Sequence, residues 1–140
     1  MTTGLWIALA AVLVALAFGG YRARTDGRFR AHEAEPSTWA RVAPATSTPP
    51  GERATLVQFS TAFCAPCRVT RRTLAEVAEL VPGVAHVEID AEQHLQLVRD
   101  LGIVRTPTTL VLDAGGHEIS RAAGAPRREQ VIAALGAAAS

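Results

Sequence analysis

Two cysteines separated by two residues form the most reactive group in the chain, within the run Phe63-Cys64-Ala65-Pro66-Cys67. A cysteine at a helix N-terminus meets unpaired backbone N–H groups and the positive end of the helix dipole, which lower the thiol pKa from about 8.5 to roughly 3.5–7.5. Cys64 is predicted to occupy such a position and to attack disulfides as a thiolate. Cys67, one turn further on, is close enough to attack the resulting mixed disulfide and release the substrate. Pro66 fits the first turn, where its missing N–H costs no helix bond.

Other uses of the cysteines fit the sequence less well. A zinc site needs four ligands, but the chain has no third cysteine and its four histidines are scattered without finger-like spacing. A purely structural disulfide would close so short a loop that it would stabilise the fold little. We therefore expect a redox pair and no metal. His86 and His117 are expected to point to solvent from strands, and none of the histidines is expected to be catalytic.

Hydrophobic periodicity predicts the elements that position the cysteines. Residues 55–59 and the alternating residues 85–89 are predicted strands, and residues 64–81, with apolar positions at helical spacing, are a predicted helix that Pro82-Gly83 ends. A second helix is predicted after a cap formed by Asp90 and Gln93, and Gly102 ends it. Strands at 108–112 and 117–121 form a predicted hairpin across a glycine-rich turn. The last helix is predicted to begin at Pro126, with Val131, Ile132 and Leu135 facing inward.

This order of elements predicts an α/β domain with a mixed four-stranded sheet flanked by helices. The first two strands are joined by a helical crossover and are therefore parallel, whereas the last two are joined by a tight turn and are antiparallel. Phe59 and Phe63 are the aromatic residues of this region, so the small core must consist mainly of Val, Leu, Ile and Ala.

The N-terminal segment is long and apolar enough to cross a membrane. Residues 2–21 carry no charge, and a helix of that length spans roughly the 30 Å of bilayer hydrocarbon. We expect an uncleaved transmembrane helix at residues 1–21. A cleaved signal peptide is the alternative, because Ala15-Leu16-Ala17 offers a small-x-small site, but no Lys or Arg precedes the apolar run. A buried core helix is disfavoured because the segment has no polar face.

The residues after the span indicate its orientation. Four arginines follow it, with only Asp26 opposing them, and such arginines favour a cytoplasmic C-terminal domain; they are Arg22, Arg24, Arg28 and Arg30. An extracytoplasmic domain is the alternative. Residues 22–53 are rich in proline and have little hydrophobic period, so they are predicted to be a basic tether, with a short helix or strand possible at 37–42. The ordered domain is predicted to cover residues 54–140.

From about Ala54 to Ala138 the chain resembles the thioredoxin family. The resemblance rests on the run 63–67, on Val-Glu-Ile-Asp at 87–90, on Gly-Ile-Val-Arg-Thr-Pro-Thr at 102–108, and on Gly124. It implies a thioredoxin-like fold with a cis proline at Pro107 beside the cysteines, and dithiol–disulfide exchange by Cys64 and Cys67. It also implies that substrate peptides contact the residues around the pair, namely Phe63, Ala65, Pro66, Thr106 and Pro107, with backbone hydrogen bonds at Thr106.

Three residues depart from the family pattern. Phe63 stands where the family usually has Trp, and Ala65 where it usually has Gly. Gln58 stands where thioredoxin has a buried acid beneath the second cysteine. Because an amide cannot act as a general base, Cys67 is expected to resolve mixed disulfides slowly.

Two classes of function fit these features. The first is a thiol–disulfide oxidoreductase that acts on proteins at the membrane, and the retained cysteine pair favours it. The second is a non-catalytic anchored adaptor of the same fold, which binds peptides in the Thr106-Pro107 groove. Expected partners are disulfide-containing or dithiol proteins, a reductase or membrane electron donor, and membrane lipid. No cofactor is expected. The net charge of +1, from 14 basic and 13 acidic residues, gives no reason to expect nucleic acid.

Overall fold

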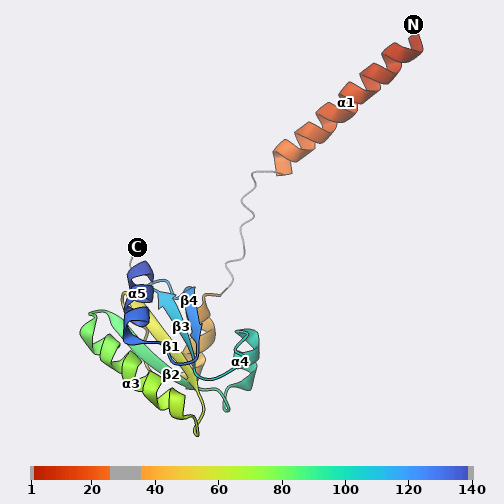
Figure 1. Cartoon of the computed structure of the whole chain (residues 1–140). Coiled ribbons are helices and arrows are strands. Elements are labelled where there is room, and N and C mark those ends of the chain that lie inside the picture. Colours follow the sequence, from red (N-terminus) through yellow and green to blue (C-terminus); the bar gives the residue numbers. More distant parts are fainter. Residues whose placement is uncertain (1, 26–35, 139–140) are drawn as a thin grey trace. The chain divides into compact units, whose positions relative to one another are not determined.

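The computed structural model describes residues 2–25 and 36–138, which form two separate units (Figure 1). The first unit contains the helix α1 (Thr2–Thr25). Its segment Thr2–Arg22 reaches a mean hydropathy of 2.1, and every large apolar side chain from Leu5 to Tyr21 is more than half exposed. The helix therefore has the length and composition of a membrane span, two properties that a signal sequence shares.

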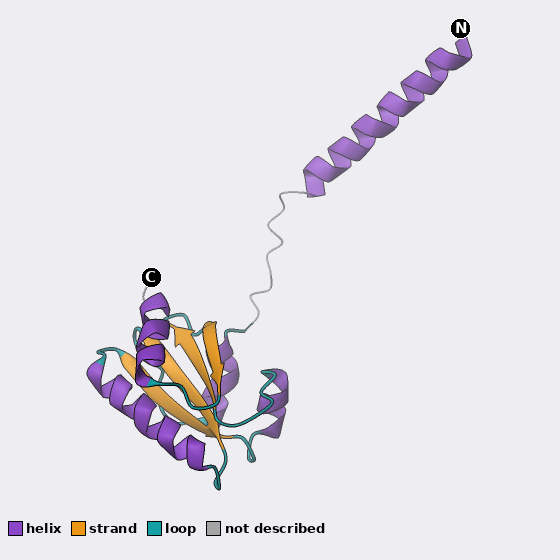
Figure 2. Ribbon diagram, in the orientation of Figure 1, coloured by secondary structure: helices purple, strands orange, loops and turns teal. Residues whose placement is uncertain are grey.

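Four strands of the second unit form one mixed sheet in the order β2-β1-β3-β4 (Figure 2). The strand β1 (Ala54–Ser60) pairs in parallel with β2 (Val84–Asp90) and antiparallel with β3 (Thr108–Asp113). The edge strand β4 (Glu118–Ala123) pairs antiparallel with β3. The predicted mixed four-stranded sheet is thus confirmed.

The central strand β1 is buried along its whole length. It has a neighbour on each side and helices over both faces, so all seven of its residues are buried, Gln58 included. A polar side chain in this strand must find its hydrogen bonds within the protein, because water cannot reach it. The end of β1 at Ser60 leads directly to the cysteine segment.

Helices cover both faces of the sheet (Figure 1). On one face lie α3 (Ala65–Leu80) and α5 (Arg128–Ala138), and on the other lie α2 (Thr38–Val42) and α4 (Leu95–Asp100). The core under α3 and α5 is formed by Ala54, Leu56, Leu74, Val77, Val111, Val131 and Leu135. The core under α2 and α4 is formed by Val42, Val57, Phe59, Val87, Ile89, Leu101, Ile103, Leu110 and Leu112.

The compact unit begins earlier than the sequence predicts. The composition of residues 22–53 predicts a tether, but the unit starts at Pro36, and Val42 in α2 is completely buried in the core. The backbone N–H of Trp39 donates to the carbonyl of Gly116 at 2.9 Å, which fixes α2 to the β3–β4 turn. A helix of five residues is too short to show a hydrophobic period, so little in the sequence points to this packing. Residues 26–35 of the predicted tether lie outside the described residues.

Two helix starts also differ from the prediction. The last helix starts at Arg128 and not at Pro126, and Ile132, expected to face inward, is 44% exposed. The helix α4 starts at Leu95, and its N-cap residue His94 makes no side-chain cap bond. The carboxylate of Asp90 accepts a hydrogen bond from the Glu92 backbone instead, which forms a turn before the helix.

Candidate active site

The two cysteines lie at the N-terminus of α3, directly after the loop that leaves β1. They are joined by a disulfide, with their Cα atoms 5.1 Å apart. Cys64 is the N-cap residue, with extended backbone at φ −109° and ψ 103°, and its Sγ accepts a hydrogen bond from the backbone N–H of Cys67 at 3.2 Å. Pro66 lies in the first turn, where the lack of an N–H leaves no helix bond unmade. The helix N-terminus thus directs its N–H groups and its positive dipole end toward Cys64.

The two cysteines differ in their access to solvent. Cys64 is partly exposed, whereas Cys67 is 1% exposed and lies against the sheet. Phe63, Ala65 and Pro66 around them are exposed, and Phe63 is completely so. A large reactant can therefore reach Cys64, and only Cys64 can reach Cys67 without rearrangement of the fold.

The Thr106-Pro107 loop lies at the same end of the sheet. In the antiparallel pairing of β1 with β3, Phe59 is opposite Thr108, so the residues that precede β3 lie beside those that follow β1. The hydroxyls of Thr61 and Thr106 are 3.5 Å apart across these two loops. The Thr106–Pro107 peptide bond is cis, as the resemblance implied, and the Pro107 carbonyl accepts from the Gly124 N–H at 2.8 Å. The structure thus brings the Thr106-Pro107 pair to the same end of the sheet as Cys64, Cys67 and the three residues around them.

Gln58 lies beneath the second cysteine and contacts it directly. Its side chain is completely buried, and its Nε2 donates a hydrogen bond to the carbonyl of Cys67 at 2.9 Å. Its Oε1 lies 3.0 Å from Nε2 of His86 on the neighbouring strand β2. Gln58 therefore connects the backbone of Cys67 to an imidazole.

A comparison with protein families identifies this arrangement. A family model described as a thioredoxin-like domain matches residues 41–139, most of the compact unit. The chain belongs to the thioredoxin family. The match begins within α2, in agreement with the packing of Val42 in the core.

Relatives of known name are thioredoxins of bacteria and plants. The thioredoxin of Alicyclobacillus acidocaldarius subsp. acidocaldarius is 31% identical over 86 residues, which cover 61% of this chain and 81% of the relative. Rice thioredoxin H2-1 is 30% identical over 74 residues, 53% of each chain. The chain thus spans about half the length of the rice protein.

Solved thioredoxin structures share the fold. Chloroplastic thioredoxin z has a TM-score of 0.55 at 29% identity, over 62% of this chain and 79% of that one. The long form of thioredoxin f from spinach chloroplast has a TM-score of 0.58 at 24% identity, over 73% and 79% of the two chains.

His86 is the site residue whose position the sequence analysis predicted incorrectly. The strand pattern predicts a side chain in solvent, but His86 is half-buried, because α3 packs against this side of the edge strand β2. Burial lowers the pKa of His86 below its usual value, Arg71 lowers it further, and the Glu88 carboxylate opposes both effects. One feature of the sequence could have indicated the contact between His86 and Gln58, because both are polar residues on two strands that the sequence predicts to be parallel neighbours.

The two charged side chains that act on the His86 imidazole form an ion pair on the surface of the thioredoxin-like domain. Arg71 of α3 binds the Glu88 carboxylate through both Nε and Nη2, the latter at 2.7 Å from Oε1. This hydrogen bond is the main reason that the pKa of Glu88 is lowered. Arg68 and Arg72, on the same helix, are exposed. Of these three exposed arginines, Arg71 is therefore the one that reaches the edge of the site.

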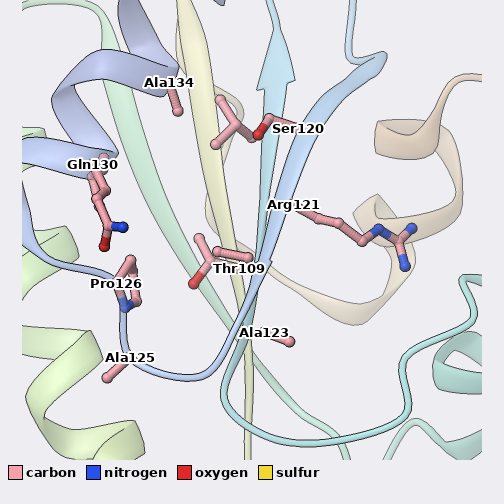
Figure 3. A pocket seen from close by; sticks show the side chains of 11 residues that line it. Thr109, Ser120, Arg121, Ala123, Ala125, Pro126, Gln130 and Ala134 are labelled. Atoms are coloured by element: carbon pink, nitrogen blue, oxygen red, sulfur yellow. The ribbon is translucent and has the colours of Figure 1, made fainter.

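The buried hydroxyls of Thr70 and Thr109 lie on the α3 and α5 side of the sheet. Neither has a hydrogen-bond partner among the described residues. Thr109 lines a cavity of about 390 Å³ between β3, β4 and α5 (Figure 3). Neither cysteine lines this cavity, so it is separate from the dithiol site. Within residues 2–25 and 36–138, no three His, Cys, Asp or Glu side chains are grouped to hold a metal ion.

Proposed function

We propose that this thioredoxin-like chain exchanges disulfides with protein substrates through Cys64 and Cys67 while anchored to a membrane. The observation that carries the proposal is the pairing of an accessible Cys64 at a helix N-terminus with a buried Cys67 one turn further on. The first position favours a thiolate that can meet a protein disulfide, and the second holds a thiol that meets only Cys64.

The exchange then runs in two steps. The Cys64 thiolate attacks one sulfur of a substrate disulfide, so that a mixed disulfide forms while the second substrate sulfur leaves as a thiolate and takes up a proton. Cys67 then loses its proton, and its thiolate attacks Sγ of Cys64, which forms the Cys64–Cys67 bond and releases the first substrate sulfur. Two electrons pass from the pair to the substrate. In the reverse direction the disulfide oxidises a substrate dithiol.

The exposed residues beside Cys64 supply the contact surface in this proposal. Phe63 is 100% exposed and Val104 is 91% exposed, so apolar side chains are present near both loops of the site. Together with Ala65, Pro66 and the Thr106-Pro107 loop, Phe63 would contact the extended substrate segment that carries the disulfide. Apolar contact on both sides of the sulfur would hold the bond in line for attack.

The N-terminal helix supports placement at a membrane. We propose that α1 is retained as an anchor and that the arginines after it hold the redox domain in the cytoplasm. In a reducing compartment the pair would act as a reductant of proteins, and a reductase or membrane electron donor would return two electrons to it after each turnover.

Two single-cysteine variants test the function. We expect Cys64→Ser to abolish reduction of a protein disulfide such as that of insulin, with dithiothreitol as the electron source. Cys67→Ser should retain attack but not resolution, and should accumulate a covalent mixed disulfide that mass spectrometry detects. Equal activity of the two variants, or wild-type binding of the substrate without turnover, would favour the adaptor instead.

A further inference from the structure

A hydrogen-bonded array behind the cysteines links the resolving residue to a titrating group. The Cys67 carbonyl accepts from Gln58 Nε2 at 2.9 Å, and Gln58 Oε1 lies 3.0 Å from His86 Nε2. Gln58 is completely buried and His86 is half-buried. The exchange steps described above use neither side chain.

We infer that His86 is a positioning residue for the resolving step, in which its Nε2–H orients the Gln58 amide that holds Cys67 and its protonation favours the Cys67 thiolate. This inference deepens the proposed thiol–disulfide exchange and rests on it.

Only one set of hydrogen-bond directions satisfies all three groups. The Cys67 carbonyl can only accept, so Gln58 must turn its Nε2–H toward Cys67 and its Oε1 toward His86. Since Oε1 also only accepts, His86 must carry a hydrogen on Nε2 in both its neutral and its protonated form. A rotated amide would place two oxygens against each other at Cys67 and two hydrogen-bearing nitrogens against each other at His86. The Cys67 carbonyl therefore sets the amide orientation, and the imidazole N–H stabilises that orientation by donating to the amide oxygen.

The array also explains how charge can reach the buried sulfur. Glu88, on the same strand, and Arg71, on α3, are the charged groups that act on His86, and they are paired with each other. Because burial and Arg71 outweigh Glu88, the pKa of His86 lies below its usual value, and the imidazole gains its charge only as the pH falls through that pKa. An imidazolium two hydrogen bonds behind Cys67 would then stabilise the thiolate that attacks Cys64.

The resolving step itself can be followed on the full chain in detergent micelles. In the reduced protein, the partly exposed Cys64 thiol attacks the disulfide of 5,5′-dithiobis(2-nitrobenzoate) at acid pH, which forms the mixed disulfide and displaces one 5-thio-2-nitrobenzoate. After removal of the displaced thiolate, the pH is raised in a stopped-flow instrument. Attack by Cys67 forms the Cys64–Cys67 bond and releases the coloured thiolate. The variants are His86→Gln, which retains an N–H donor without a titrating charge, and His86→Leu, which has neither. His117→Gln is the control, because His117 lies in the β3–β4 turn at the opposite end of the sheet.

We expect each variant to change a different part of the pH profile. His86→Gln should match the wild type while His86 is neutral and resolve about threefold more slowly once the pH falls below the pKa of His86, where the wild type gains the imidazolium charge. His86→Leu should be slower than the wild type by about tenfold while His86 is neutral, the rate factor that corresponds to one ordinary hydrogen bond, and slower still at lower pH, where it lacks the charge as well. His117→Gln should follow the wild type.

Other results would overturn the inference. Identical profiles for the wild type and His86→Gln would show that the charge has no role, and equal slowing of both His86 variants at every pH would indicate a packing effect alone. If His86→Leu does not fold, the comparison of the wild type with His86→Gln decides, because that variant removes the charge and keeps the N–H donor. Failure of the wild type to release the coloured thiolate would instead contradict the proposed function.

Discussion

Gln58 differs from a buried carboxylate in one property that matters at this site, because an amide donates and accepts hydrogen bonds at the same time. Its N–H groups satisfy the carbonyl of Cys67, and its oxygen accepts from His86. An ionised carboxylate has no hydrogen to offer the Cys67 carbonyl. Gln58 therefore lacks the general base of the family pattern. In its place it provides a neutral connection between the Cys67 carbonyl and the His86 imidazole, which a carboxylate could not both satisfy.

Replacement of Gln58 by the isosteric acid tests this role. Gln58→Glu should lower the free energy of unfolding by about 1–3 kcal/mol at neutral pH, because it leaves the Cys67 carbonyl unpaired and buries a carboxyl group. Burial raises the folded-state pKa of the new carboxyl, so the loss should be smallest below its unfolded-state pKa and should grow as the pH rises toward the folded-state value. Denaturation of the full chain from pH 4 to pH 8 measures this trend. Gln93→Glu, at an exposed position, is the control, and its free energy of unfolding should differ from that of the wild type by the same amount at every pH.

At the scale of single residues, the sequence predicted the position of the cysteine pair at a helix N-terminus and of a cis proline beside it. The spacing of Cys64 and Cys67 and the Thr106-Pro107 pair are local patterns, so each could be recognised without knowledge of the fold. The position of His86 depends on which face of an edge strand a helix covers, which is a property of packing. For that reason the contact between His86 and Gln58 became evident only in the structure.

At the scale of elements, the short helix α2 is the part of the domain that the sequence left undetermined. It is held by the Trp39 hydrogen bond to Gly116 and by burial of Val42. Strands and longer helices repeat their pattern several times, whereas α2 contributes only Val42 as a buried residue. A single apolar residue in a short helix becomes part of a core only if it packs against residues far away in the sequence. Val42 packs in this way against the sheet.

Gly116 offers a direct test of this docking. The residue has a φ of 79°, and a Cβ atom there would lie 2.6 Å from Cβ of Trp39. Gly116→Ala should therefore lower the free energy of unfolding by about 2 kcal/mol, because it adds backbone strain and pushes α2 away from the turn. Denaturant unfolding, followed by Trp39 fluorescence in a Trp6→Phe background, measures the effect.

The neighbouring glycine is a matched control. A Cβ at Gly115 would lie 3.0 Å from Nδ1 of His117, the end of a side chain that can rotate. Gly115→Ala should therefore change the stability by no more than about 0.5 kcal/mol. If both alanine variants unfold at the same denaturant concentration, the turn does not support α2 as described.

At the scale of the whole molecule, the chain joins a thioredoxin-like domain to a candidate membrane span. The fold class followed from the sequence because a helical crossover and a tight turn leave few ways to order four strands. The extent of the domain did not, since residues 36–53 resemble a linker in composition and yet belong to the compact unit. The orientation of the span depends on the charges that flank it. The fold of the compact unit does not depend on these charges.

Thiol labelling determines the side of the membrane on which the pair lies. In intact cells that contain the full chain and have been treated with an impermeant reductant, an impermeant maleimide should not label Cys64, whereas lysed cells treated in the same way should show labelling. The chain should also remain in the membrane fraction after alkaline carbonate washing, with its N-terminal segment present by mass spectrometry. Labelling in intact cells would place the domain outside, and loss of residues 1–21 would identify a signal peptide.

The central claim, that the bond between Cys64 and Cys67 is a working redox couple, is tested most directly by equilibration of the full chain with glutathione buffers of graded potential. Alkylation and mass spectrometry then give the fraction of dithiol at each potential. We expect a reversible two-electron curve with a midpoint between roughly −300 and −120 mV, the range of thioredoxin-like catalysts. A bond that stays oxidised at every potential, or that does not re-form after reduction, would contradict the account and would make the disulfide structural.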